Sequence, residues 1–225
     1  MTEHLLIVFP HPDDETFRKA GTIALHTKAG QPATLICATL GQMGRNMGKP
    51  FFANRETLPI VREQELREAC RVLGVDDLRL FRLRDKTLEF EDPDFLADKI
   101  EQVIREVKPS KIMTFYPGHG VHPDHDALSA AAVRAVARLP KEERPVMWTS
   151  AVTPNAAEVV GSPDIEIDVS EVVDVKLAAY RAHRSQSEAM MKRMEAQMAE
   201  DPAFKEQTEQ NLRREAFWIY PVDND

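Results

Sequence analysis

Residues 5–15 read LLIVFPHPDDE, an apolar run that ends directly in a histidine, two aspartates and a glutamate. A turn needs some polarity, but Pro12 and one capping residue would supply it. Four ionisable groups in five positions are more than a turn requires. The stretch therefore predicts a buried strand that leads either into a helix start of unusual charge or into a binding site.

Composition and charge restrict the class of protein. The chain has 225 residues, so we expect one domain over 1–225, and an apolar fraction of 43% is typical of a globular protein. The net charge of −8 argues against a nucleic-acid-binding protein. No run approaches the roughly 18–20 apolar residues of a membrane span, and we see no signal-peptide pattern. Cys37 and Cys70 lie in apolar patterns that predict buried thiols, so we expect a soluble cytoplasmic protein.

Short apolar runs alternate with amphipathic stretches through the first two-thirds of the chain. Four continuous apolar runs predict strands covered on both faces, at 4–9, 33–39, 78–81 and 111–116. Helical patterns lie between and after these strands, at 17–29, 59–73, 92–107 and 125–138. This alternation predicts an α/β fold with a Rossmann-like, doubly wound, mostly parallel sheet and helices on both faces.

The last third of the chain predicts more strands and a helical C-terminal extension. VMWTSAV (146–152), IEIDVS (165–170) and FWIYPV (217–222) are short strand candidates. A long helical stretch over 171–213 has an expected break at Asp201-Pro202, and its methionines are typical of packing or of contact with a second copy in a homo-oligomer. The least regular segment is 41–57.

Two polar clusters follow the first and the fourth predicted strands. They are HPDDE (11–15) and YPGHGVHPDH (116–125). In open α/β sheets, ligands bind beyond the carboxyl ends of the strands. Because the two strands are plausible neighbours, we expect both clusters at one edge of the sheet and a shared site there.

The side chains of the two clusters match the needs of a metal-assisted amide hydrolase. The candidates are His11, Asp13, Asp14, His122, Asp124 and His125. Two histidines and one aspartate satisfy a catalytic zinc ion, which lowers the pKa of its water from about 15.7 to about 7. A carboxylate that is not a ligand can take the proton of that water, and a histidine held protonated by an aspartate can stabilise the oxyanion. We predict that His11, His125 and one of the paired aspartates bind the metal.

Other interpretations of the same residues are weighed against this one. Asp13, Asp14 or Asp124 could each serve only as a helix N-cap. A sugar- or nucleotide-binding module without catalysis should carry a glycine-rich phosphate loop after the first strand, where this chain has PHPDDE. A metal-dependent phosphoesterase could also use histidine and aspartate. His119 is expected to be an ordinary loop residue, and His183 to have a structural role or to approach the rim of the site.

At these motifs the sequence resembles a known family. PHPDDE and HPDH are similar to the motifs of the zinc-dependent N-acetylglucosaminyl deacetylases of the PIG-L/LmbE-like group. Four further segments resemble that group in order: ATLGQMGRN (38–46), VREQELREACRVLGV (61–75), RLRDKTLEF (82–90) and KLAAYRAHRSQ (176–186). Within the group, the segment 41–59 looks most like the deacetylases of bacillithiol biosynthesis, which remove acetate from N-acetylglucosaminyl malate.

The resemblance implies a role for each residue of the motifs. His11, Asp14 and His125 would bind Zn²⁺, with Fe²⁺ or Co²⁺ as alternatives. Asp13 would be the general base. His122 would stabilise the tetrahedral intermediate or protonate the leaving amine, and Asp124 would orient it. Arg62 and Asp85 match positions that contact the sugar.

Two features of the loops complete these expectations. Relatives of the mycothiol pathway carry a tyrosine at the position of Gly120, so any role of that tyrosine is either absent here or met by another residue such as Tyr116 or His119. In the irregular segment, Arg45 and Arg55 suit a carboxylate such as that of malate, or they are only surface arginines. The implied substrate is an N-acetylated glucosamine derivative, with another N-acyl sugar or small N-acyl amide as the alternative.

Overall fold

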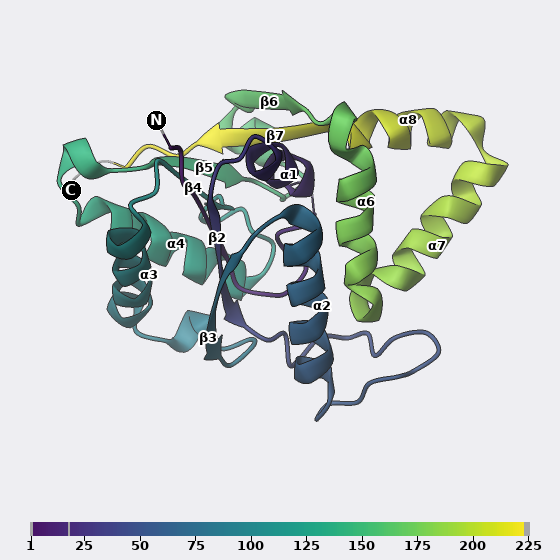
Figure 1. Ribbon diagram of the computed structural model, residues 1–225, viewed down its shortest axis with the longest axis horizontal. Coiled ribbons are helices and arrows are strands. Elements are labelled where there is room, and N and C mark those ends of the chain that lie inside the picture. The colour runs from purple at the N-terminus through teal and green to yellow at the C-terminus, as the bar shows by residue number, and fades with distance from the viewer. Residues whose placement is uncertain (1, 18, 223–225) are drawn as a thin grey trace.

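The strand that begins at Leu5 has a parallel neighbour on each side in the computed structural model, which describes residues 2–17 and 19–222. The strands are β1 (Leu5–Phe9), β2 (Ala33–Thr39), β3 (Asp77–Leu83), β4 (Lys111–Phe115), β5 (Val146–Ser150), β6 (Ile165–Asp168) and β7 (Arg214–Ile219). They form a seven-stranded sheet in the order β3-β2-β1-β4-β5-β7-β6 (Figure 1). The first five strands are parallel, and β7 runs antiparallel to β5 and β6.

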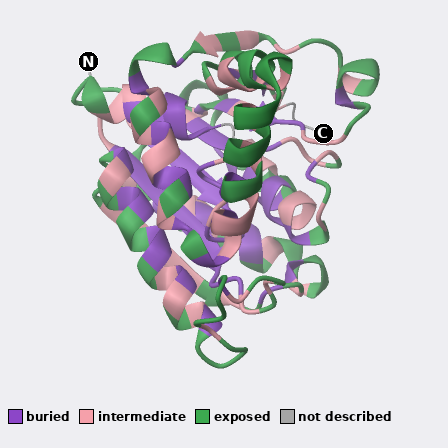
Figure 2. Cartoon of the chain, turned by 90° about the vertical axis from the view of Figure 1, so that its right-hand side faces the viewer, coloured by how far each residue is buried: buried purple, intermediate pink, exposed green. Residues whose placement is uncertain are grey.

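Helices cover both faces of this sheet, as the continuous apolar strands predict. The helices are α1 (Ala20–Lys28), α2 (Leu58–Leu73), α3 (Pro93–Val107), α4 (Pro123–Ala137), α5 (Ala156–Val160), α6 (Val173–Ala182), α7 (Arg184–Glu200) and α8 (Pro202–Leu212). Side chains of β1 alternate between two cores: Leu5, Ile7 and Phe9 pack with residues of α1, α2 and α6, whereas Leu6 and Val8 pack with α3 and α4. The central strands β1, β2 and β4 are therefore buried from both sides, whereas the edge strands β3 and β6 are only partly buried (Figure 2). The predicted fold class is confirmed.

Three helix boundaries differ from the predicted ones. The first helix begins at Ala20 instead of residue 17, because residues 11–17 form consecutive turns. The fourth helix begins at Pro123, with His122 as its N-cap residue. The long helical stretch is interrupted at the expected Asp201 and also at His183. The helices α7 and α8 that follow His183 extend away from the sheet (Figure 1).

A buried ion pair joins three elements that are distant in sequence. Lys176 of α6 and Glu215 of β7 are 1% and 2% exposed, and Lys176 Nζ lies 2.7 Å from Glu215 Oε1. The Glu215 carboxylate also accepts hydrogen bonds from the backbone N–H groups of Gly21 (3.0 Å) and Thr22 (2.7 Å). The N-cap residue of α1, Lys19, provides no side-chain cap. Glu215 of β7 therefore accepts hydrogen bonds from the free backbone N–H groups in the first turn of α1 and caps that helix.

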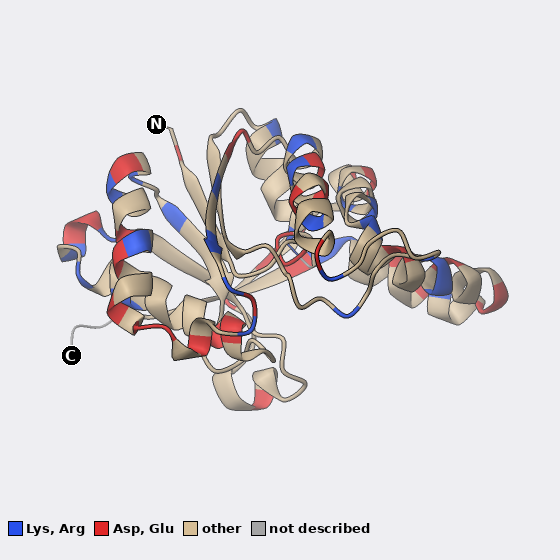
Figure 3. Cartoon of the chain, turned by 90° about the horizontal axis from the view of Figure 1, so that it is seen from below, with Lys and Arg blue, Asp and Glu red and all other residues tan. Residues whose placement is uncertain are grey.

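Basic and acidic residues are spread over the helices and loops around the sheet, with both signs interspersed (Figure 3). Among the described residues, none of the helices is both long enough and apolar enough to cross a membrane.

We expect Glu215→Gln to lower the stability of the protein. The substitution leaves the Lys176 ammonium buried without a counter-charge, which costs about 3–5 kcal/mol. For a chain of this size, such a loss lowers Tm by roughly 6–20 °C. Thermal unfolding measures this shift, with Glu166→Gln as the control because Glu166 is largely exposed on the neighbouring strand. An equal Tm for the two variants would contradict the structural role given to the buried pair.

Candidate metal centre and active site

Both polar clusters lie beyond the carboxyl ends of β1 and β4, which are hydrogen-bonded neighbours. The chain continues from β1 to strands on one side of the sheet and from β4 to strands on the other. Such a switch point leaves a crevice where ligands bind in α/β sheets. The expected convergence of residues 11–15 and 116–125 is therefore confirmed.

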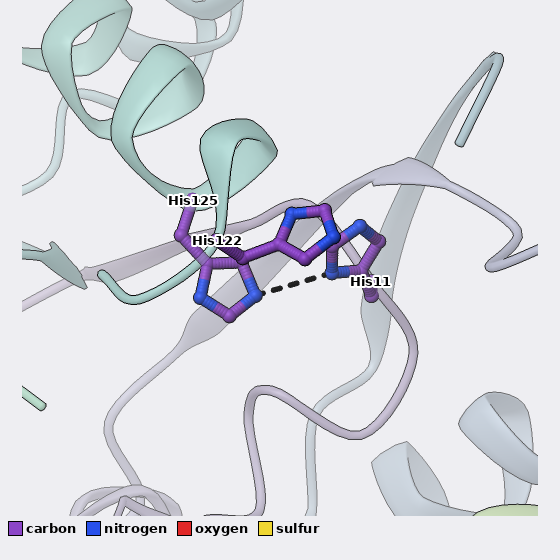
Figure 4. A group of neighbouring side chains, drawn as sticks. All are labelled: His11, His122 and His125. Atoms are coloured by element: carbon purple, nitrogen blue, oxygen red, sulfur yellow. Dashed lines mark hydrogen bonds between the residues drawn. The ribbon is translucent and has the colours of Figure 1, made fainter. Parts of the chain in front are cut away.

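The three predicted metal ligands bring their donor atoms together. His11 Nδ1 lies 3.2 Å from His125 Nε2 (Figure 4). The two oxygens of Asp14 reach one histidine each, with Oδ2 at 3.4 Å from His11 Nδ1 and Oδ1 at 3.3 Å from His125 Nε2. Ligands that surround zinc tetrahedrally at 2.0–2.1 Å are about 3.3–3.4 Å from one another. The spacing and the His₂Asp donor set therefore fit one divalent metal ion.

The opposite nitrogen of each histidine ring is held by a hydrogen-bond acceptor. His125 Nδ1 donates to the carbonyl oxygen of Gly120 at 2.7 Å. His11 Nε2 lies 3.0 Å from Asp124 Oδ2 and 3.1 Å from Asp85 Oδ1. These contacts fix the tautomers, so that His11 Nδ1 and His125 Nε2 present lone pairs to the same point. Metal-binding histidines usually have partners of this kind.

Asp124 supports His11 rather than His122. Its carboxylate also accepts the backbone N–H groups of Lys86 (2.7 Å) and Leu88 (3.0 Å) and is fully buried. The expected orientation of His122 by this carboxylate differs from the observed contacts, since residues two apart at a helix start do not face each other. Only the backbone N–H of Asp124 reaches His122, at 3.1 Å from Nδ1.

His122 lies beside His11 and His125, but its ring has no carboxylate or carbonyl partner like theirs among the described residues. Its ring centre is 4.9 Å from that of His11 and 5.3 Å from that of His125 (Figure 4). Since Nδ1 accepts a hydrogen bond from the Asp124 N–H, the neutral ring carries its proton on Nε2. Burial lowers the pKa of His122, and so would the charges of His11 and His125 whenever those two rings are protonated. His122 is thus a neutral hydrogen-bond donor. Its ring also lies close enough to His11 and His125 for the three histidines to form an alternative metal-binding group.

Asp13 differs from its neighbour Asp14 in environment. Burial raises the pKa of Asp13 to about 6, although Arg62 opposes this shift. A carboxylate with a pKa near neutrality suits a general base. Arg62 Nη2 lies 3.1 Å from Asp13 Oδ2 and also donates to the carbonyl oxygen of Pro12, while Nη1 donates to that of Gly41 at 2.9 Å. Arg62 thereby fixes the side chain of Asp13.

Of the other three residues of the predicted site, only Asp85 contacts one of the predicted ligands. Asp85 is buried against His11 and accepts the backbone N–H of Met43 at 2.7 Å. Arg55 donates to the carbonyl oxygen of Gly44 at 2.7 Å, so it holds the loop 41–57 in shape. Arg45 is exposed on that loop and lines a cavity of about 590 Å³ between the loop and the start of α7.

Two buried residues were not predicted as part of the site. Glu15 is the last residue of HPDDE, and its carboxylate contacts both Asp13 and His183. For His183 the sequence predicted either a structural role or an approach to the rim of the site, and not a contact with Glu15. The sequence did contain a signal for Glu15, because it is the fourth ionisable residue of HPDDE and the predicted metal site has no role for it.

Gly120 has no room for a side chain. A Cβ atom at this position would lie 2.5 Å from the Cβ of His125. Tyr116, which was one candidate to take over a role of the missing tyrosine, packs edge-on against His119, and His119 Nδ1 lies 2.7 Å from Thr153 Oγ1. The close approach of Gly120 lets its carbonyl oxygen accept the hydrogen bond from His125 Nδ1.

Comparison with known proteins identifies the family. The profile described as PIG-L, GlcNAc-PI de-N-acetylase, matches residues 6–136. A protein of Bacillus cereus named "Probable N-acetyl-alpha-D-glucosaminyl L-malate deacetylase 2" is 56% identical over 220 residues, which are 98% of this chain and 99% of that relative. The chain belongs to the PIG-L family. The family expected from the HPDDE and HPDH motifs is thereby confirmed.

Two solved structures share the fold of this PIG-L chain. N,N'-diacetylchitobiose deacetylase from Pyrococcus horikoshii superposes with a TM-score of 0.73 at 22% identity, over 98% of this chain and 84% of that protein. The 4-carboxy-2-hydroxymuconate hydratase of Pseudomonas putida has a TM-score of 0.74 at 18% identity, over 100% and 99%. At 22% and 18% sequence identity, these similarities are evidence for a shared fold and not for a shared reaction. The names describe different reactions, so the chemistry has to be argued from the site.

We expect Gly120→Ala to weaken metal binding about 10–100-fold, because the added methyl group displaces His125 and the carbonyl oxygen that orients it. Titration with zinc against a competing chelator measures the affinity. Gly118→Ala is the control, since a Cβ there meets open space and only its φ of +82°, which has no counterpart at Gly120, would strain an alanine. Equal metal affinities in the two variants would show that the contact between Gly120 and His125 is unimportant.

Proposed function

We propose that this PIG-L chain is a metal-dependent hydrolase that removes the N-acetyl group from a glucosamine derivative, with N-acetylglucosaminyl malate as the substrate. The observation that carries the proposal is the set of donor atoms of His11, Asp14 and His125, 3.2–3.4 Å apart, next to a half-buried Asp13 that is not part of the set. The B. cereus relative, 56% identical over nearly the whole chain, supports the choice of substrate.

The His₂Asp set suits Zn²⁺, and Fe²⁺ or Co²⁺ would also fit. When bound, the metal would act as a Lewis acid that polarises the amide carbonyl and makes water reactive at neutral pH. His11 and His125 would bind it through Nδ1 and Nε2, respectively, because their other nitrogens are already hydrogen-bonded. Asp14 would supply the third ligand.

Asp13 would accept the proton of the attacking water. Its pKa of about 6 leaves it ionised at neutral pH yet basic enough to take a proton. Arg62 would keep its carboxylate in place through the 3.1 Å contact. The proton would then pass to the amine that leaves with the sugar.

His122 would donate a hydrogen bond from Nε2 to the oxygen of the tetrahedral intermediate or to the leaving nitrogen. Asp124 and Asp85 would hold His11 at the orientation that its ligand role needs. Contact of Arg62 or Asp85 with the sugar stays a prediction, since the contacts of both residues are to the protein itself.

A carboxylate-bearing substrate fits the cavity beside the loop 41–57. The described residues of its lining include Arg45, Lys49 and Arg184 and no aspartate or glutamate, in a chain whose net charge is −8. Malate carries two carboxylates, which guanidinium groups bind in pairs of hydrogen bonds. Arg45 would bind one of them, and Arg55 would contribute through the loop that it holds together.

The compartment and the assembly are part of the same proposal. Cys37 and Cys70 are buried free thiols, which suits the reducing cytoplasm. The protruding helices α7 and α8 offer a surface for contact with a second copy of the chain (Figure 1). The proposal therefore includes a homo-oligomer formed through these helices.

Acetate release together with metal content tests the proposal. The purified protein is expected to contain about one equivalent of metal and to release acetate from N-acetylglucosaminyl malate much faster than from N-acetylglucosamine. Metal without acetate from either compound would assign the site to another N-acyl sugar or small N-acyl amide. No metal after reconstitution would leave a non-catalytic binding module and overturn the proposal.

Asp13→Ala is expected to keep its metal and to lose about 10²–10⁴-fold in kcat, because only the proton acceptor is removed. Elemental analysis and the acetate assay measure the two quantities on the same sample. Asp14→Ala is the matched control and should lose the metal itself. Loss of metal from the Asp13 variant would mean that the two aspartates exchange or share their roles.

A further inference from the structure

Asp13 has a backbone conformation that is rare for a residue with a side chain. Its φ is +105°, outside the regions that L-amino acids normally occupy. Such a conformation persists only where the surroundings enforce it, and it is frequent at functional sites. The contacts that enforce it here are therefore relevant to how Asp13 reaches its reactive position.

Glu15 restrains the backbone of Asp13 directly. The N–H of Asp13 donates to Glu15 Oε2 at 3.0 Å. The carbonyl oxygen of Asp13 is also held, because it accepts the N–H and the hydroxyl of Thr16 at 3.0 and 2.7 Å. Both peptide groups that flank Asp13 are thus fixed, one of them by a side chain whose position depends on a further partner.

That partner is His183, which lies 168 residues away in sequence at the junction of α6 and α7. His183 Nε2 lies 2.5 Å from Glu15 Oε1, and the two residues are 0% and 1% exposed. Burial lowers the pKa of His183, but the charge and the hydrogen bond of Glu15 outweigh it and the pKa is raised. The pair is therefore a short charge-assisted hydrogen bond sealed from water.

In the described part of the chain, only one of the two ring nitrogens of His183 is hydrogen-bonded, namely Nε2, which contacts Glu15. Its Nδ1 atom is buried without a hydrogen-bond partner among the described residues. A buried polar atom without a partner weakens a fold, so stability alone would favour an apolar side chain or one with fewer polar atoms here. The backbone of His183 is rigid, because its carbonyl oxygen accepts the N–H groups of Gln186 and Ser187 in the first turn of α7.

We propose that Glu15 and His183 are positioning residues that hold Asp13 in its strained conformation and thereby place its carboxylate for proton transfer. The inference rests on the proposed function of Asp13 as general base. Arg62 orients the side chain of Asp13, and the pair Glu15–His183 orients its backbone. His183 lies beyond residues 6–136, so the pair makes the C-terminal third of the chain part of the catalytic apparatus.

Three variants separate this role from a general effect on folding. In Glu15→Gln, the amide has one oxygen to accept from two donors, the N–H of Asp13 and the Nε2–H of His183, so one of the contacts is lost. His183→Leu removes the donor while filling the space, and His183→Gln restores a donor. Glu215→Gln is the matched control, because Glu215 is equally buried, equally paired with a cation and equally bonded to backbone N–H groups, but at the start of α1.

We expect Glu15→Gln and His183→Leu to lower kcat by about 10–100-fold, as displacement of a reacting group by about 1 Å does. KM should stay within twofold of its original value and metal content near one equivalent, while His183→Gln should recover part of the loss. Glu215→Gln should lower Tm without lowering kcat. Equal losses of kcat in Glu15→Gln and Glu215→Gln would overturn the proposal, and so would a parallel loss of metal.

A second measurement keeps the test independent of the substrate. Hydrogen exchange of the Asp13 amide, followed by NMR, should be slow in the original protein and faster in Glu15→Gln and His183→Leu. If no substrate releases acetate, the proposed function fails, yet faster exchange would still establish that the pair restrains Asp13. Unchanged exchange in both variants would overturn the positioning role whatever the activity.

Discussion

The parallel pairing of β1 with β4 is the contact on which the site depends. The register places Leu5 opposite Lys111 and Ile7 opposite Met113, so the two strands end at the same edge of the sheet. The turn after β1 supplies His11, and the helix start after β4 supplies His125. Their nitrogens lie 3.2 Å apart although 114 residues separate them. Burial of β1 on both faces makes this register rigid, because a shift by one residue would exchange the two cores.

The site tolerates many carboxylates in a small volume because each is matched with positive charge or with N–H groups. Burial raises the pKa of both Asp13 and Asp14. At Asp14, His125 and His11 outweigh burial and hold the pKa well below its usual range, whereas at Asp13 the pKa rises to about 6. Asp14 therefore stays ionised, whereas its neighbour Asp13 can gain and lose a proton near neutral pH. Environments that separate pKa values in this way assign different chemical roles to identical side chains.

The C-terminal third of the chain packs onto this edge of the molecule. His183 reaches Glu15 of the turn that follows β1, and Ser185 donates its N–H and hydroxyl to Glu65 of α2, both at 2.6 Å. Gln186 and Asn46 exchange hydrogen bonds with each other's backbone carbonyl groups and thereby tie α7 to the loop 41–57. The segment from α6 to the start of α7 consequently supports both the turn that carries Asp13 and the wall of the cavity.

The sequence by itself determined the fold class, the family and the convergence of the two polar clusters at one edge of the sheet. Continuous apolar runs such as LLIVF require cover on both faces, and the chain order of strands and helices leaves the doubly wound sheet as the solution. HPDDE and HPDH follow two of these strands, and the carboxyl-end rule then unites His11 and His125. These conclusions depend on local patterns and on strand order, which a linear chain records directly.

Only the tertiary structure decided how the remaining polar groups are used. Asp124 was expected to orient His122, but its carboxylate contacts His11, because the first turn of α4 points the two side chains in different directions. The partnership of Glu15 with His183 and the exclusion of a side chain at Gly120 arise from approaches between segments that are distant in sequence or tightly folded. Such contacts depend on the exact placement of atoms in three dimensions, and no periodicity in the sequence encodes them.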